Sequence, residues 1–236
     1  MARRLRISGE GAIHHITSRC NNEEFLLNTE KEFNKYLEII GDCKKRYNFK
    51  LYHYALLNNH IHLLLQIGEK GSVSEILKYI NGVYAGWYNR VKDRKGHFWQ
   101  DRFGSKVIEA ENYFLRCAIY IELNPVRAGL VKNSLDWKFS SARASIKGEN
   151  DKIIDISDVY LSLGCDTKER QFEYSSLLKL ELERTNALNE AIKENNKKMA
   201  RKILRMGQPD FIPYKKKLAK FFGYSLTRVL NIHKSA

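Results

Sequence analysis

The sequence of 236 residues has no hydrophobic run that approaches the ~20 residues required by a membrane-spanning helix. Its first residues are basic and lead into Ile7-Ser8-Gly9-Glu10 rather than into an apolar stretch, which does not fit a signal peptide. No G-x-x-x-x-G-K-[ST] or G-x-G-x-x-G motif occurs, so nucleotide hydrolysis at a phosphate-binding loop is not expected. These absences predict a cytoplasmic protein that does not span a membrane.

Cysteine is scarce and dispersed. The four cysteines are Cys20, Cys43, Cys117 and Cys165, and no two of them form a C-x-x-C pair. A zinc ribbon or zinc finger needs such closely spaced ligands, so neither is expected. We predict four reduced thiols, as is usual in the cytosol.

Positive charge is abundant. Lys and Arg number 41 against 27 Asp and Glu, which gives a formal net charge of +14. Such an excess favours polyanionic partners, chiefly nucleic acid or an anionic membrane surface. Hydrophobic residues make up 43% of the chain, which is enough for a packed core and excludes wholesale disorder.

Hydrophobic periodicity predicts an α+β fold in the first part of the chain. Strands are expected at 11–19, 51–57, 60–66 and 106–109, and helices at 29–47, 73–92 and 111–123. Thr29 and Glu32 have the spacing of a capping box at the first helix start. This order indicates a ferredoxin-like antiparallel sheet with helices packed on it.

The composition changes after the first 148 residues. We predict a domain over 1–148, a linker over 149–165 and a basic helical extension over 166–236. Residues 181–236 hold 13 Lys and Arg against 5 Asp and Glu, a net charge of +8. Within them, 214–229 weakly resembles a helix-turn-helix. The extension is interpreted as an accessory nucleic-acid contact, with a regulatory or dimer-bracing helix as the alternative; its deletion should weaken binding and reduce the salt dependence of binding.

The sharpest local pattern is His60-Ile61-His62. Residues two apart in a strand point to the same face, so both imidazoles should project together while Ile61 turns to the core. Two such imidazoles can ligate one divalent metal ion. A His-x-His pair also occurs by chance, and an incidental pair is the alternative.

A second pattern lies on the third predicted helix. Tyr120 and Asn124 are four residues apart and therefore share a helix face, where the amide oxygen of Asn124 could reach a metal. The alternative is a packed tyrosine and an Asn that caps the helix before Pro125. Tyr113 is an alternative tyrosine, and Glu122, two residues from Tyr120, is expected to be solvated or salt-bridged rather than catalytic.

These residues together resemble a known family. His60-Ile61-His62 is similar to the HUH motif, and the block from Tyr120 to Leu130 (YIELNPVRAGL) is similar to the tyrosine motif of single-tyrosine transposases. The stretch from about Gly11 to Ser145 resembles the IS200-like transposase domain in its REP-associated branch. The resemblance implies the HUH nuclease fold.

The resemblance also implies an activity. It makes Tyr120 the nucleophile that nicks and rejoins hairpin-forming single-stranded DNA through a 5′-phosphotyrosine, and it makes His60, His62 and Asn124 the metal ligands. The implied ion is Mg²⁺ or Mn²⁺, and imidazole ligands favour Mn²⁺. A homodimer and a nucleoid-associated location fit this activity, and a DNA partner leaves no membrane partner to be expected. The alternatives are a non-catalytic DNA- or RNA-binding regulator on the same fold and a nuclease that uses water.

Further candidate residues concern DNA binding. Because charge and aromatic faces bind unpaired bases, we predict contacts from an N-terminal basic cluster, an aromatic loop and the tyrosine block. These residues are Arg3, Arg4, Arg6, His97, Phe98, Trp99, Arg102 and Arg127. Core packing is an equal alternative for the aromatic side chains. His14 and His15 are adjacent in a strand, so only one of them can face the site.

Overall fold

The computed structural model describes residues 9–109, 111–206 and 221–222. The chain divides into two compact units, one up to Phe172 and one from Glu173. Arg3, Arg4 and Arg6 lie outside the described residues, as does nearly all of the predicted helix-turn-helix at 214–229. No helix in the described part of the chain combines the length and apolar character needed to cross a lipid bilayer.

The first unit is built on one antiparallel sheet. Its strands are β1 (Ile13–Arg19), β2 (Lys50–Leu56), β3 (His60–Gln66) and β4 (Gly104–Ile108). They lie in the order β2-β3-β1-β4, and every neighbouring pair is antiparallel. This topology confirms the predicted α+β fold with a ferredoxin-like sheet.

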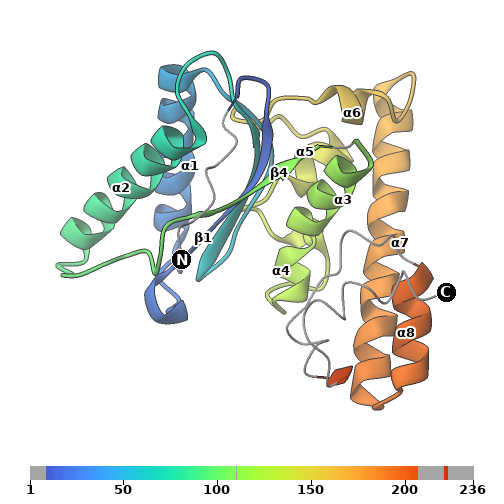
Figure 1. The fold of residues 1–236 in the computed structure, drawn as a ribbon. Helices are drawn as coiled ribbons and strands as arrows, with labels where there is room; N and C mark the ends of the chain where they lie inside the picture. The colour runs from blue at the N-terminus through green and yellow to red at the C-terminus, as the bar shows by residue number, and fades with distance from the viewer. Residues whose placement is uncertain (1–8, 110, 207–220, 223–236) are drawn as a thin grey trace. The chain divides into compact units, whose positions relative to one another are not determined.

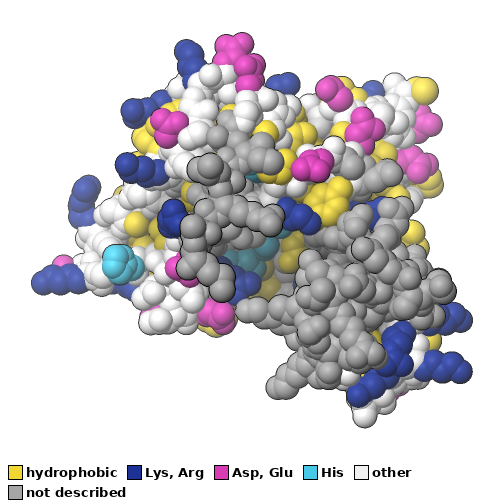
Figure 2. Space-filling model, in the orientation of Figure 1, with side chains coloured by type: hydrophobic (Ala, Val, Ile, Leu, Met, Phe, Trp, Pro, Cys, Tyr) yellow, Lys and Arg dark blue, Asp and Glu magenta, His cyan; other side chains and the backbone are white. Residues whose placement is uncertain are grey.

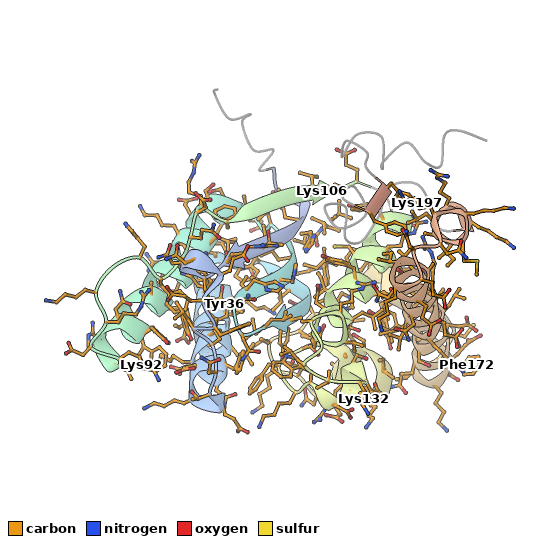
Figure 3. All side chains as sticks on the ribbon, turned by 90° about the horizontal axis from the view of Figure 1, so that it is seen from below. Tyr36, Lys92, Lys106, Lys132, Phe172 and Lys197 are labelled. Atoms are coloured by element: carbon orange, nitrogen blue, oxygen red, sulfur yellow. The ribbon has the colours of Figure 1, made fainter. Side chains whose placement is uncertain are left out.

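Two long helices cover one face of the sheet (Figure 1). They are α1 (Glu30–Tyr47) and α2 (Val73–Val91), and each begins with a complete capping box, which confirms the one predicted from Thr29 and Glu32. Tyr36 of α1, labelled in Figure 3, is fully buried and donates its hydroxyl to Asn81 Oδ1 of α2 at 2.9 Å. Apolar side chains of β1 and β3, such as Ile16 and Leu63, complete this core.

Shorter helices pack on the opposite face (Figure 1). They are α3 (Glu111–Glu122), α4 (Asn124–Arg127), α5 (Ala142–Lys147) and α6 (Asp158–Leu161), with 3-10 turns at Asn21–Glu23 and Ser134–Asp136. The third predicted helix thus ends at Glu122, and Pro125 lies in the first turn of the next helix, where a missing N–H costs nothing.

The segment 149–165, predicted as a linker, belongs to the first unit. Asp151 accepts a hydrogen bond from the Tyr54 hydroxyl at 2.8 Å, and Asp155 accepts one from the Leu51 N–H at 2.7 Å. Asp155 also forms an ion pair with Lys44 of α1. These contacts attach the segment to β2 and to α1, so it is part of the first unit rather than a free connection.

The second unit is helical. It contains most of α7 (Thr167–Lys193) and all of α8 (Lys197–Met206), which are joined by a turn in which Asn195 adopts a positive φ of 52°. The Asn196 side chain accepts the Met199 N–H at 2.9 Å and caps the start of α8. The buried side chains between the helices are Leu188, Ala191, Ala200, Ile203 and Leu204, together with Phe222.

Candidate active site

The two histidines of the His-x-His motif lie side by side on β3, as the strand period predicts. Their ring centroids are 5.0 Å apart, and His62 is 5% exposed. Ile61 between them is fully buried in the core that faces α1 and α2. The turn at Asn58 and Asn59 fixes where β3 begins. The backbone carbonyls of these two residues accept hydrogen bonds from the N–H groups of Leu27 and Cys20 respectively.

A third histidine joins the pair from the neighbouring strand. Thr17 of β1 is directly opposite His62, and His15 lies two residues before Thr17, on the same face of the sheet and diagonal to His62. His15 Nε2 is 3.0 Å from His62 Nδ1, and the two rings are stacked with centroids 5.2 Å apart. His14 is turned to the opposite face, where its Nδ1 lies 2.9 Å from Ser105 Oγ. This confirms that only one of the adjacent histidines can face the site.

The structure brings Tyr120 of α3 onto this histidine cluster. The Tyr120 ring lies edge-on to His62 at 5.7 Å and to His15 at 6.0 Å between centroids. Tyr113, the alternative tyrosine, instead contacts Lys106 of β4, which is labelled in Figure 3. The geometry therefore selects Tyr120 as the tyrosine that faces the His-x-His pair.

The residues that follow α3 hold its last turn. Asn124 Nδ2 donates to the Tyr120 carbonyl at 2.8 Å, and Arg127 Nη1 donates to the same oxygen at 3.1 Å. The Arg127 guanidinium carbon also lies 4.8 Å from the centre of the Tyr120 ring, a cation–π distance. Asn124 thus caps the helix end, as its alternative interpretation proposed, and Arg127 is a direct neighbour of Tyr120.

Burial sets the charge of the cluster. It lowers the pKa of His15 and of His60 to about 4, with smaller contributions from Lys106 and Arg19 respectively. Burial, followed by the neighbouring His15, holds the pKa of His62 well below its ordinary value. Burial raises the pKa of Tyr120, and the nearby positive charge of Arg127 opposes that rise. At neutral pH the imidazoles are therefore neutral and the phenol keeps its proton.

Neutral imidazoles are the form that binds metal ions. His60 Nδ1 lies 2.6 Å from Asn59 Oδ1, which can only accept, so the proton sits on Nδ1 and Nε2 keeps a lone pair. The His62 Nδ1 is likewise engaged, by His15. In the described residues no group of three or more His, Cys, Asp or Glu side chains is placed to hold a metal. The two histidines fit an ion whose remaining ligands come from other groups, and the assignment of Asn124 as a ligand stays a prediction.

Glu122 is fully buried rather than solvated. One of its oxygens, Oε1, accepts hydrogen bonds from His53 Nδ1 at 2.8 Å, Ser141 Oγ at 2.6 Å and Ser145 Oγ at 2.7 Å. Burial by itself would raise the pKa of this carboxyl, but these hydrogen bonds, with that from His53 the strongest, hold it below its ordinary value. Its buried hydrogen-bond partner His53 is a residue for which the sequence offered no spacing signal.

Phe98 and Trp99, the two aromatic side chains predicted to contact DNA from the loop between α2 and β4, both pack against α2. Phe98 is 2% exposed and packs on Tyr84 and Tyr88, so it cannot stack on a base, and its assignment as a DNA contact is corrected to the core. Trp99 is half-buried and donates its indole N–H to the Asn81 carbonyl at 2.9 Å, which also favours packing.

Two exposed polar side chains of the same loop lie at the surface. His97 and Arg102 of the same loop are exposed and so remain candidates for DNA contact. Figure 2 shows cyan histidine side chains in the middle of the drawn face, next to dark-blue Lys and Arg side chains. The positive charge needed to attract a phosphate backbone is therefore present beside histidines at the surface.

Known proteins resemble this chain in sequence and in fold. The model of the IS200-like transposase family matches residues 10–124. A REP-associated tyrosine transposase of Haemophilus influenzae is 30% identical over 126 residues, which cover 49% of this chain and 72% of that protein. A solved REP-associated tyrosine transposase bound to a REP hairpin shares the fold, with a TM-score of 0.54 at 23% identity over 67% of this chain and 93% of that one. The chain therefore belongs to the IS200-like transposase family, in its REP-associated tyrosine branch.

Proposed function

We propose that this transposase nicks and rejoins single-stranded DNA through Tyr120. The observation that carries the proposal is the placement of the Tyr120 ring of α3 against His62 of the His60–His62 pair, on an interior strand of the sheet. A tyrosine held beside two neutral imidazoles combines a nucleophile with ligands for a divalent ion in one site.

The reaction is a transesterification. Tyr120 Oη attacks the scissile phosphorus, the P–Oη bond forms and the P–O3′ bond breaks. The phenol proton is released, the departing 3′-oxygen takes up a proton, and the 5′-phosphate stays on Tyr120. In the second half an incoming 3′-hydroxyl attacks the phosphotyrosine and the Tyr120 oxygen leaves. The phosphodiester energy is conserved, which agrees with a sequence that has no nucleotide-binding loop.

A divalent ion, Mg²⁺ or Mn²⁺, would be held by His60 and His62, with Asn124 as the predicted third ligand. When bound, it would polarise the phosphoryl oxygens and stabilise charge that develops during attack. The chain's own residues do the rest. His60 and His62 offer neutral imidazoles, and Arg127 places a positive charge beside the Tyr120 ring, where it favours the phenolate when Tyr120 acts as leaving group.

The proposed substrate is a hairpin-forming single strand. The solved relative is bound to a REP hairpin, and this chain carries a net charge of +14 that suits a polyanion. Exposed His97 and Arg102 are proposed to contact its backbone. A homodimer is a further proposal, which the same family pattern motivates.

The test is to trap the covalent product. The protein is incubated with end-labelled single-stranded hairpin DNA and Mn²⁺ or Mg²⁺, denatured, and assayed for a protein–DNA adduct on a gel. Wild type and Tyr113→Phe should form the adduct, whereas Tyr120→Phe should form none because it lacks the attacking oxygen. A wild-type protein that binds the hairpin without any adduct would favour the regulator, and cleavage without an adduct would favour a water-dependent nuclease.

A further inference from the structure

The buried carboxylate of Glu122 connects three elements of the first unit. Its Oε1 accepts from His53 on β2 and from Ser141 and Ser145, which precede and belong to α5. Ser141 is itself tied to the sheet, because its Oγ accepts the Tyr54 N–H at 3.1 Å and its N–H donates to the Tyr54 carbonyl at 3.0 Å. One side chain of α3 is thus bonded both to a strand and to a helix that is fixed on that strand.

The same helix turn carries the tyrosine on another side. An α-helix advances by about 100° per residue, so Tyr120 and Glu122 project about 200° apart around α3. Tyr120 faces the histidines of β1 and β3, while Glu122 faces β2 and α5. A rotation of α3 about its axis would therefore move both side chains, and the Glu122 hydrogen bonds oppose that rotation.

Apolar packing alone would fix the rotation of α3 about its axis less strictly than these hydrogen bonds do. Dispersion contacts tolerate small slides and rotations, whereas hydrogen bonds to an ionised acceptor are short and directional. Three such bonds meet at one oxygen of a fully buried group, and a displacement of α3 would leave several buried donors unpaired at once.

We propose that Glu122 is a positioning residue, which fixes the rotation of α3 and thereby holds the Tyr120 hydroxyl where it can attack the scissile phosphate. This inference rests on the proposed function of Tyr120. His53, Ser141 and Ser145 act through Glu122, and none of the four touches the substrate.

Glu122→Gln tests the proposal, since it keeps the shape of the side chain but removes the ionised acceptor. Adduct formation is measured under single-turnover conditions, which separate the rate constant from the fraction of competent protein. A small misplacement of the nucleophile can lower the rate about 10- to 100-fold. We expect a loss of that size in the rate constant, while the adduct amplitude and the hairpin Kd stay near the wild-type values. A residue that only stabilised the fold would lower the amplitude and leave the rate constant unchanged.

Further variants keep the test decisive if Glu122→Gln folds poorly. Ser145→Ala removes one donor and keeps the charge, so it should cause a smaller loss of rate in the same direction. Glu122→Gln combined with His53→Gln should be no slower than the slower single variant, because both remove the same contact. Tyr160→Phe is the matched control: it removes the hydroxyl that donates to the Ser145 backbone carbonyl at 2.7 Å but leaves the Ser145 Oγ donor to Glu122 in place, so the rate should not change.

The outcomes separate this inference from the proposed function. A Tyr120-dependent adduct that forms at the wild-type rate in Glu122→Gln or Ser145→Ala overturns the positioning role alone. An adduct that survives in Tyr120→Phe, or a wild-type protein that forms none, overturns the proposed function and the positioning role together.

Discussion

The two faces of the sheet have opposite chemistry although they alternate along the same strands. Ile16 of β1 and Ile61 and Leu63 of β3 point toward α1 and α2 and are fully buried in a continuous apolar core. The intervening residues His15 and His62 point the other way, toward α3. A strand has a period of two, so a single residue of register separates a core position from a site position.

This difference indicates a division of labour. The apolar face stabilises the sheet through packing that needs no particular partner, whereas the polar face holds its groups through individual hydrogen bonds such as His15 to His62 and His53 to Glu122. Damage to the first face should change how much protein is folded. Damage to the second should change what the folded protein does.

The largest expected effect comes from the polar face. His62→Ala removes one proposed ligand, and the several kcal/mol of transition-state stabilisation that a bound ion supplies correspond to a rate loss of at least about 100-fold. Single-turnover adduct formation measures this loss, and a gel-shift assay checks that hairpin binding persists. Tyr113→Phe is the control, because Tyr113 contacts Lys106 rather than the histidine cluster. Loss of binding with an unchanged rate per bound complex would contradict the assignment of His62.

The next effect comes from the apolar face. Leu63→Ala leaves a cavity beside a fully buried core and should lower the free energy of unfolding by about 2–5 kcal/mol. Chemical denaturation measures the change. The rate constant of adduct formation per folded molecule should stay at the wild-type value. If the rate constant fell as strongly as in His62→Ala, the two faces would not be functionally distinct.

A smaller effect should appear as pH falls. The unfolded chain binds protons on histidine near pH 6.5, whereas His15 and His60 have a pKa of about 4 in the folded protein. Their contribution to stability is therefore complete above pH 6.5 and is lost as pH falls toward 4. Each can add up to about 1.4 kcal/mol per pH unit to the slope. Denaturation curves between pH 7 and pH 5 compare wild type with His15→Gln/His60→Gln, whose slope should be shallower. Leu63→Ala should shift the wild-type curve without changing its slope.

The smallest effect concerns the loop that joins α2 to β4. This loop holds an exposed charged side chain, Arg102, and a buried apolar one, Phe98. Arg102 is exposed, so Arg102→Ala should weaken hairpin binding modestly and reduce the slope of log affinity against log salt by about 1. Fluorescence anisotropy at several salt concentrations measures this slope. Phe98→Leu, a change to a buried side chain of the same loop, should affect stability and leave the slope unchanged. An unchanged slope in Arg102→Ala would remove Arg102 from the DNA-contact residues.

Local periodicity predicted most of the fold. The strand at His60–Gln66, the helix from Glu30 to Tyr47 and its capping box follow from patterns within a few residues, and the structure confirms them. The segment 149–165 was predicted as a linker because the composition of the chain changes after residue 148. Its polar groups bond to β2 and α1, and such partners, distant in sequence, leave no local pattern.

The site shows the same limit. Strand alternation placed His60 and His62 on one face, but the choice between His14 and His15 depends on which face of β1 lies toward α3. Glu122 could be separated from Tyr120 by helix geometry, yet nothing near it in the sequence predicts a buried carboxylate bonded to His53, 69 residues away. Phe98 likewise had the composition of a base-stacking residue until its neighbours on α2 buried it.

By itself, the sequence determined the chemical inventory of this transposase: a net charge of +14, two histidines in strand alternation and a tyrosine four residues before Asn124 on a helix. Only the tertiary structure decided which of these groups meet. In the folded protein His15 contacts His62, the Tyr120 ring lies against both, and three donors hydrogen-bond to Glu122. The physical reason is that side-chain direction is a local property of backbone period, whereas hydrogen bonding and burial depend on strand register and helix packing between distant segments.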